Sequence, residues 1–177
     1  YRATRPLYTT QLFIPEMGAD HAPRAFGVEK LIRPSNWVIV YKGQVSAPTD
    51  GRYRFLAYAD DLIAVAVNNR LVVLAGRPDS VNRLPIWSPP PQGPRFPAAN
   101  GHLVYGDWLD LRKDQPFDLD VLVGERPGGK FSAFLLFEKE GSTAPEVFQL
   151  APAEVPLAPA GKSVPFRIPH QPWVGLQ

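Results

Sequence analysis

Proline is the feature that most restricts what this chain can form, with 21 prolines in 177 residues, joined by 14 glycines. Proline removes a backbone donor and clashes with the preceding helical turn, and glycine weakens helices through its backbone entropy. Long helices are therefore excluded, and with them an all-helical bundle and most doubly wound α/β folds. Aromatic residues, which favour strands, make up 11% of the chain. The sequence predicts a β-rich fold with many turns.

Alternation of apolar and polar residues gives the clearest strand signal between residues 52 and 74. One face of the first run carries Tyr53, Phe55 and Ala57, as expected for successive side chains that point to opposite sides of a strand. The expected strands are 52–59, 62–67 and 70–74. Asp60-Asp61 forms the first turn, and Asn68-Asn69 forms a two-residue hairpin, because Asn tolerates the left-handed backbone of a type I′ turn.

Further strands are expected on both sides of this region. They are Thr10–Ile14, Trp37–Val45 with an extension toward Pro48, Trp108–Arg112, Phe117–Val123 and Phe131–Lys139. This pattern predicts an all-β, antiparallel two-sheet β-sandwich of jelly-roll-like architecture. The apolar faces of four strands give the expected core, namely Tyr53, Phe55, Val65, Val67, Leu119, Val121, Leu135 and Phe137.

The chain divides by composition into three parts. Residues 1–36 read as an irregular N-terminal segment with one strand near 10–14, ended by Pro15, and one helical turn after Pro23. Residues 37–140 form the sandwich core, which the N-terminal strand joins. Residues 76–102 form a long proline-rich loop within that core, of a length that is usually functional or disordered. Residues 141–177 are a proline-rich C-terminal strap or linker.

Charge and residue content exclude several functions. The net charge is only +2, and no run of three basic residues provides the stripe that nucleic-acid binding needs. The absence of cysteine excludes disulfides and thiol catalysis. The longest apolar run, Leu62–Val67, is far too short to cross a membrane, so no transmembrane segment is expected in this chain. The three histidines are scattered, no serine lies in a nucleophile elbow, and no enzyme activity is expected.

The segment Gly124–Lys130 matches the spacing G-x-x-x-x-G-K of a nucleotide-binding loop. That motif also requires Ser or Thr as the next residue and a helix that faces the phosphates. Phe131 follows here, and the residues after it alternate as a strand does. The segment is therefore predicted to be a hairpin turn.

Two features have both a binding and a structural interpretation. The adjacent carboxylates Asp60 and Asp61 repel each other, so a cation such as calcium would stabilise them, but aspartates at a strand end also cap turns or pair with arginine. Trp87 lies among prolines in the long loop. Its ring could stack on a sugar face or simply pack against Pro85 and Pro89.

The order and spacing of several short motifs resemble a known family. The matching residues are Tyr41-x-Gly43, Ala47-Pro48, Gly51-x-Tyr53-x-Phe55, Ala59-Asp60-Asp61 and Val65-x-Val67-Asn68-Asn69, followed by Trp108-x-x-Leu111, Phe117-x-Leu119-x-Val121 and Gly129-x-Phe131-x-Ala133-x-Leu135. Residues 37–138 are thereby similar to the anthrax protective-antigen domain family. That lectin-like β-sandwich also occurs in yeast flocculins and inside some β-glucosidases.

The resemblance implies a non-catalytic carbohydrate-binding module of an exported or cell-surface protein, located in the secreted, periplasmic or surface compartment. In sugar-binding members the aspartate pair holds calcium, which in turn holds vicinal sugar hydroxyls; here the pair is Asp60 and Asp61. The late ligand loop falls on 124–130, where Glu125 is the only oxygen side chain, beside Arg126 and Lys130. The pair is expected at an exposed loop near that turn, with calcium or one of those basic residues as its counter-charge.

A second interpretation stays open beside the first. The chain would then be a structural or protein-interaction module of a larger envelope or secreted protein, with no sugar or metal site. Its partner would be an envelope protein rather than a glycan. The candidate carbohydrate-binding residues carried forward are Asp60, Asp61, Glu125 and Trp87, and the candidate metal ligands are Asp60 and Asp61.

Overall fold

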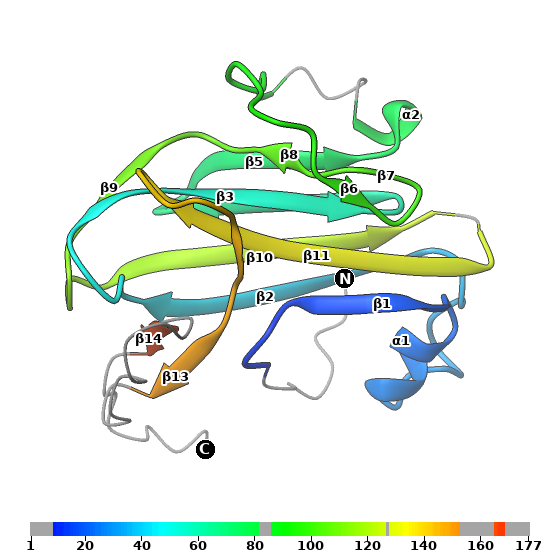
Figure 1. Ribbon diagram of the computed structural model, residues 1–177. Coiled ribbons are helices and arrows are strands. Elements are labelled where there is room, and N and C mark those ends of the chain that lie inside the picture. Colours follow the sequence, from blue (N-terminus) through cyan, green and yellow to red (C-terminus); the bar gives the residue numbers. More distant parts are fainter. Residues whose placement is uncertain (1–8, 82–85, 127, 153–164, 169–177) are drawn as a thin grey trace, which may run out of the picture.

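Two β-sheets face each other in the computed structural model, which describes residues 9–81, 86–126, 128–152 and 165–168 (Figure 1). The six-stranded sheet has the order β1-β11-β3-β8, with β12 also pairing with β11 and β9 with β3. The four-stranded sheet has the order β2-β10-β4-β5. The strands of the first sheet are β1 (Phe13–Gly18), β3 (Gly51–Ala59), β8 (Val104–Tyr105), β9 (Leu109–Leu111), β11 (Lys130–Lys139) and β12 (Glu146–Val147). Those of the second are β2 (Trp37–Val45), β4 (Leu62–Val67), β5 (Arg70–Gly76) and β10 (Phe117–Glu125). The predicted all-β sandwich is confirmed.

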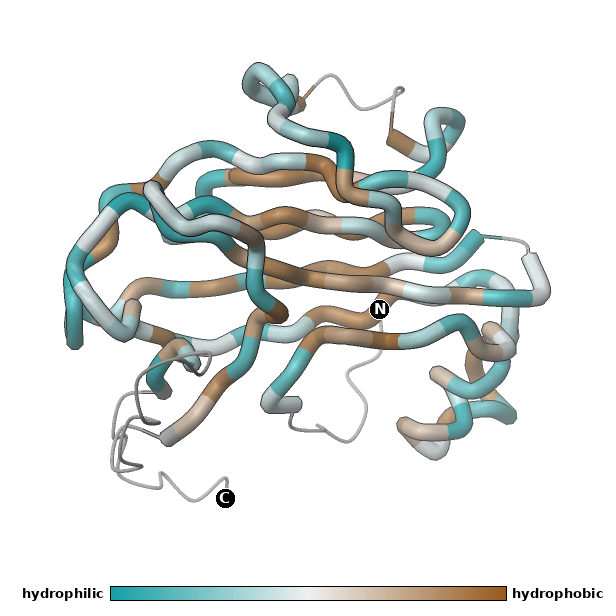
Figure 2. The backbone as a smooth tube through the Cα atoms, viewed as in Figure 1, coloured by the Kyte–Doolittle hydropathy of each residue, from teal (hydrophilic) through white to brown (hydrophobic). Residues whose placement is uncertain are grey.

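The hydrophobic core lies between the two sheets, and all eight side chains predicted to form it are buried. Apolar residues follow each central strand at alternate positions, visible as brown segments along the tube in Figure 2. Because every second side chain of a strand points to the same face, the alternation in the sequence identified the inner face correctly.

The strand limits between residues 51 and 76 agree with the prediction, but one pairing does not. β4 and β5 form an antiparallel hairpin, closed by Asn68 and Asn69 at φ of 48° and 62°. β3 does not pair with β4; it belongs to the other sheet, and the chain crosses between the sheets at Asp60-Asp61. Alternation shows that a segment is a strand, but it does not show which sheet the strand joins.

The same correction applies to residues 124–130. β10 lies in the four-stranded sheet and β11 in the six-stranded sheet, so the connection between them crosses the sandwich and is not a hairpin turn. Of the Pro127-Gly128-Gly129 turn expected there, Pro127 lies outside the described residues.

The N-terminal strand starts later than predicted and passes through Pro15 instead of ending there. Proline is tolerated because β1 is an edge strand, and its register against β11 shifts between Ile14 and Met17. Helix α1 (His21–Ala25) follows, and Pro23 lies inside it rather than before it.

The proline-rich region 76–102 contains local structure. It begins with the short helix α2 (Pro78–Val81) and ends with the hairpin of β6 (Pro97–Ala98) and β7 (Gly101–His102). The hairpin packs on the outer face of the six-stranded sheet, where a second cluster buries Leu56 and Tyr58, on the face of β3 opposite Tyr53, Phe55 and Ala57. The outer cluster consists of Leu56, Tyr58, Ala98, Leu103 and Tyr105.

The described part of the C-terminal tail packs into the sandwich. β13 (Leu150–Pro152) and β14 (Phe166–Ile168) form a small parallel pair, and Phe148 and Phe166 lie in the main core. Residues 141–177 therefore contribute core side chains in addition to any role as a strap or linker. In the part of the chain that the structure describes, no helix has the length and apolar character needed to span a membrane.

Candidate functional site

Two of the connections that cross between the sheets meet at one end of the sandwich. The first is Asp60-Asp61, between β3 and β4, and the second is the 124–130 segment, between β10 and β11. The backbone N–H of Arg126 donates a hydrogen bond to Asp61 Oδ2 at 2.7 Å. The structure thus brings together the two loops that sequence reasoning placed side by side.

Asp61 is buried, with only 5% of its surface exposed, so the expectation of an exposed position is wrong for this residue. Its backbone carbonyl accepts a hydrogen bond from the N–H of Arg77 at 3.1 Å, and the Arg77 guanidinium lies 3.9 Å from Asp61 Oδ1. Lys130, one of the two basic residues expected to balance this carboxylate, instead pairs with Glu16 at 2.6 Å. Arg126 contributes a backbone donor, and the nearby positive charge comes from Arg77.

Asp60 is the more accessible member of the pair and is half-buried. Its backbone N–H donates to the carbonyl of Ser132 on β11 at 2.9 Å, which fixes the strand end. Partial burial, reinforced by the neighbouring Asp61 carboxylate, raises the pKa of Asp60, while the Asn100 side chain and the more distant Arg77 lower it. Asp60 is therefore the more exposed of the two aspartates.

Glu125 is buried more deeply than either aspartate, with 3% exposure. Neither of its carboxylate oxygens has a hydrogen-bond donor among the described residues. Burial, together with the adjacent Asp61 carboxyl and the charge of Asp60, raises the pKa of Glu125 to about 8. At neutral pH Glu125 mostly retains its proton, and it can donate that proton to Asp61.

The three carboxyl groups do not fit calcium in this arrangement. Calcium needs six to eight oxygen ligands converging on one point. Among the described residues, no group of three or more His, Cys, Asp or Glu could hold a metal ion. Asp61 Oδ2 already accepts the Arg126 hydrogen bond, and Arg77 lies near Asp61 Oδ1. Of the two expected ligands, Asp61 instead joins the two loops through its carboxylate.

Trp87 is half-buried and packs against the main core. Its indole N–H is buried without a hydrogen-bond partner among the described residues. No hydrogen bond or ring contact within that part of the chain joins Trp87 to the carboxylates of Asp60, Asp61 or Glu125. This environment favours the packing interpretation, although Pro85, one of the two expected neighbours, lies outside the described residues.

Asn100, in the turn of the β6–β7 hairpin, is the residue that sequence reasoning missed. It is exposed, and its Oδ1 accepts a hydrogen bond from the Tyr58 hydroxyl, while its side chain also lowers the pKa of Asp60. Nothing in the sequence signals this contact, because Tyr58 and Asn100 are 42 residues apart and the intervening region reads as a proline-rich loop.

Comparison with known proteins gives a likeness in structure alone. No protein-family model matches the sequence, and no curated protein matches it. The chain is similar to the PA14 sugar-binding domain from an RTX adhesin, at 16% identity and a TM-score of 0.51, over 78% of this chain and 72% of that one. The PA14 domain of the MpAFP antifreeze protein gives 14% identity and a TM-score of 0.51, over 78% and 68% of the two chains.

A weaker likeness, at 15% identity and a TM-score of 0.43, covers 63% of this chain and 48% of the epithelial adhesin 9 A domain from Candida glabrata, solved with Galb1-3GlcNAc. At these identities the two PA14 domains show the fold of this chain. The antiparallel β-sandwich predicted from the sequence is therefore the fold observed.

Proposed function

We propose that this chain is a non-catalytic carbohydrate-binding module of an exported or cell-surface protein. The observation that carries the proposal is the half-buried carboxylate of Asp60, held at the end of the sandwich beside the exposed amide of Asn100. A carboxylate and a primary amide side by side offer acceptors and donors to adjacent hydroxyl groups of a sugar. The fold supports this function, since a domain of similar architecture is described as sugar-binding.

Sugar binding in this proposal does not depend on calcium. The Asp61 carboxylate accepts a hydrogen bond from the Arg126 N–H and lies near the Arg77 guanidinium. Glu125 is largely protonated at neutral pH. Calcium would have to displace these contacts and the Glu125 proton before it gained a ligand shell. Asp60 and Asn100 are therefore the groups that meet the ligand directly, and Asp61 and Glu125 position them.

The second candidate is a structural or protein-interaction module of a larger envelope or secreted protein. The same contacts of Asp61 favour it, because a buried aspartate that joins two loops needs no ligand. In that case Asp60 would be an ordinary strand-end residue, and no glycan would bind at this end of the molecule.

Glycan-array binding and calorimetry, with calcium and with a chelator, test the proposal. The wild-type chain should retain a defined set of glycans in both conditions, and Asp60→Asn should weaken that binding at least tenfold. Asp110→Asn is the matched control, since Asp110 is an exposed aspartate on β9. Loss of glycan binding in the presence of chelator would mean that the site does require calcium. Saturable calcium binding that is lost in Asp61→Asn would then identify Asp61 as a calcium ligand. An array without any retained glycan would favour the protein-interaction module.

A further inference from the structure

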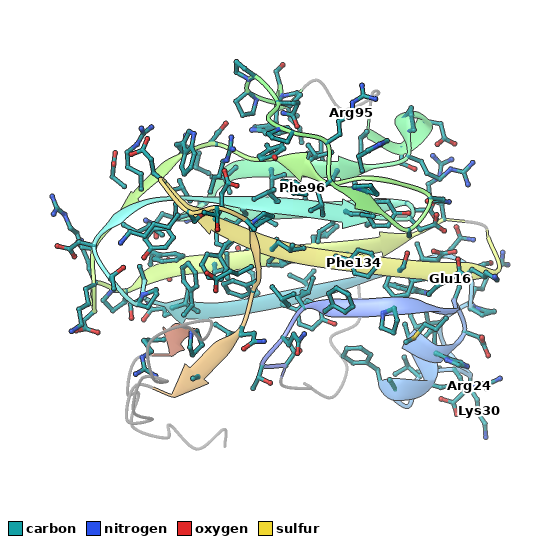
Figure 3. All side chains as sticks on the ribbon, in the orientation of Figure 1. Glu16, Arg24, Lys30, Arg95, Phe96 and Phe134 are labelled. Carbon is teal, nitrogen blue, oxygen red and sulfur yellow. The ribbon has the colours of Figure 1, made fainter. Side chains whose placement is uncertain are left out.

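The outer faces of the two sheets differ in what covers them. The six-stranded sheet carries the outer cluster described above, and Phe96 and Phe134 pack against that cluster (Figure 3 labels both). Among the described residues, no such cluster of buried side chains forms on the outer face of the four-stranded sheet. Two of the exposed large hydrophobic side chains, Val38 and Val40, instead lie on this face, on β2.

Apolar side chains continue from β2 across this outer face. Because β10 pairs with both β2 and β4, Val40 lies opposite Leu122, and Leu122 lies opposite Ala64. Val38 and Leu62 flank Gly124 in the next row. Leu62, Ala64 and Leu122 are only half-buried. These side chains form an apolar band, defined as Val38, Val40, Leu62, Ala64 and Leu122. A continuous exposed apolar surface of this kind marks an interaction site.

The outward positions of β10 change from acidic to apolar to basic along the strand. They are Asp118, Asp120, Leu122 and Gly124, and Arg126 follows directly after the strand. Residue 127 is proline, and a residue before proline keeps an extended backbone, so Arg126 continues the same alternation. Asp118 and Arg126 are both exposed. They lie four residues on either side of Leu122, about 13 Å in each direction.

Asp118 and Arg126 have no side chain of opposite charge as a partner among the described residues. The Asp118 carboxylate accepts a hydrogen bond from the neutral Gln44 amide at 3.0 Å. Arg126 donates its backbone N–H at the crossing, and its guanidinium forms no ion pair within that part of the chain. Asp120, by contrast, pairs with Lys42 at 3.2 Å. An unmatched acid and an unmatched base therefore lie at equal distances from the centre of the apolar band.

We propose that this face is the interface of a homodimer, in which the four-stranded sheets of two copies stack face to face with their strands antiparallel. A two-fold axis that runs across the strands at Leu122 sets this residue against Leu122 of the second copy. The same axis places Arg126 of each copy over Asp118 of the other, so both unmatched charges gain a partner. A parallel stack would instead set like charges against each other, which disfavours association.

The rows between the axis and the charged ends also fit. Two residues from the axis, Asp120 faces Gly124 of the second copy, and the missing side chain of glycine leaves room for the Lys42–Asp120 ion pair. Lys42 faces Val38 of the second copy. Its methylene stem can cover this exposed valine while its ammonium group stays with Asp120. The antiparallel stack therefore buries apolar surface without separating the existing ion pair.

The size of the face predicts a weak dimer. Stacked sheets lie about 10 Å apart with their strands about 30° from alignment, an angle that displaces Arg126 from the facing Asp118 by roughly one strand spacing. The long arginine side chain can span that shift. Four strands by about 26 Å of strand length give roughly 500 Å² per copy. Since standard interfaces bury about 800 Å² per partner, the dimer should form only at micromolar or higher concentration.

Antiparallel stacking also fixes the direction of the two candidate glycan sites. Asp60 lies at the Arg126 end of each copy, because the neighbouring Asp61 accepts the Arg126 N–H. The two Asp60 ends therefore point away from each other. Such a dimer bridges two glycan-bearing surfaces rather than binding one surface at two points. This consequence rests on the proposed function, whereas the dimer itself does not.

Sedimentation equilibrium at micromolar to millimolar concentrations tests the dimer. Asp118→Arg and Arg126→Asp should each weaken it roughly tenfold, because each sets like charges against each other. The double variant Asp118→Arg/Arg126→Asp exchanges the two charges, so its dissociation constant should return to within about threefold of the wild-type value. Asp110→Arg is the matched control, because Asp110 is an exposed aspartate on β9 of the other sheet, and it should leave the dimer unchanged.

A cross-link locates the interface. The chain has no cysteine, so Leu122→Cys introduces a single thiol on the two-fold axis. A thiol cross-linker that spans less than about 10 Å should join two Leu122→Cys chains and not two Asp110→Cys chains. A dimer without the Leu122→Cys link would indicate pairing through the β2 edges, where the two β10 strands are about 14 Å apart, and overturns the proposal.

Two further results overturn the dimer: a monomer at every concentration, and a dimer that both single charge reversals leave unchanged. Glycan binding does not enter these measurements. An array without any retained glycan therefore removes the proposed function and the bridging consequence, and leaves the dimer standing. A monomeric chain that still binds glycans overturns the dimer alone.

Discussion

Asp61 Oδ2 accepts a hydrogen bond from the backbone N–H of Arg126 at 2.7 Å, across 65 positions of sequence. The contact joins two of the places where the chain passes from one sheet to the other, between β3 and β4 and between β10 and β11. It explains why this aspartate is buried while its neighbour Asp60 remains accessible. One carboxylate of the pair therefore joins the two loops, and the other is the one that the proposed ligand would contact.

Removal of the Asp61 carboxylate should destabilise the fold. Asp61→Ala leaves the Arg126 N–H without an acceptor, and an unsatisfied, partly buried donor costs about 1–3 kcal/mol. Asp61→Asn retains an oxygen acceptor and removes the charge next to Glu125, so its loss should be smaller. Urea unfolding of both variants measures the difference. Equal stability of Asp61→Ala and the wild type would mean that the Arg126 contact contributes nothing.

Glu125 should make the stability of the protein depend on pH. Its pKa rises from the usual 4.5 to about 8 in the folded chain, so the native state holds the proton more tightly than the unfolded state does. The contribution of Glu125 to the free energy of unfolding should then be highest below about pH 4.5. It should fall by at most about 1.4 kcal/mol per pH unit as the pH rises to 8.

Glu125→Gln isolates that contribution, because glutamine is a neutral side chain of the same shape. The difference in unfolding free energy between variant and wild type should shift in favour of the variant as the pH rises from 5 to 8. Urea unfolding at several pH values measures it, with Glu140→Gln as an exposed control. A difference that does not change with pH would show that Glu125 ionises normally in the folded chain.

Phe55→Ala should cost roughly 3–5 kcal/mol, because it removes a ring from the centre of the core. Phe55 is 1% exposed, and its ring lies 5.6 Å from that of Phe148 and 6.1 Å from that of Phe166. Thermal and urea unfolding measure the loss, and Ile86→Ala, at an exposed position, is the control. A thermal shift near zero for Phe55→Ala would show that this face of β3 contributes little to the core.

Phe166 gives the corresponding test for the C-terminal tail. It is fully buried, and its ring contacts those of Phe137 at 4.9 Å and Phe148 at 5.2 Å. Phe166→Ala should therefore lower stability by roughly 3–5 kcal/mol, as expected for a core phenylalanine. Unfolding curves followed by tryptophan fluorescence and by circular dichroism should still coincide. Unchanged stability would mean that the tail does not belong to the cooperative unit.

Local sequence determined the strands and their inner faces. The side chains of Tyr53, Phe55 and Val65 follow the period-two rule, and the hairpin at Asn68-Asn69 follows from the backbone that asparagine tolerates. These are properties of a few consecutive residues. They could be predicted because the same physical preference acts wherever such a stretch occurs.

Tertiary structure decided which strands are neighbours, and with them the candidate site. β3 pairs with β11, β8 and β9 and not with β4, because each strand joins the sheet where its apolar face and its hydrogen-bonding edges are both satisfied. The burial of Asp61 and the contact between Tyr58 and Asn100 depend on segments far apart in the chain. Residues 52–74 alone were enough to single out the Asp60-Asp61 pair at a strand end. Which of the two carboxylates is buried and which is more accessible depends on the packing of loops that are distant in the sequence.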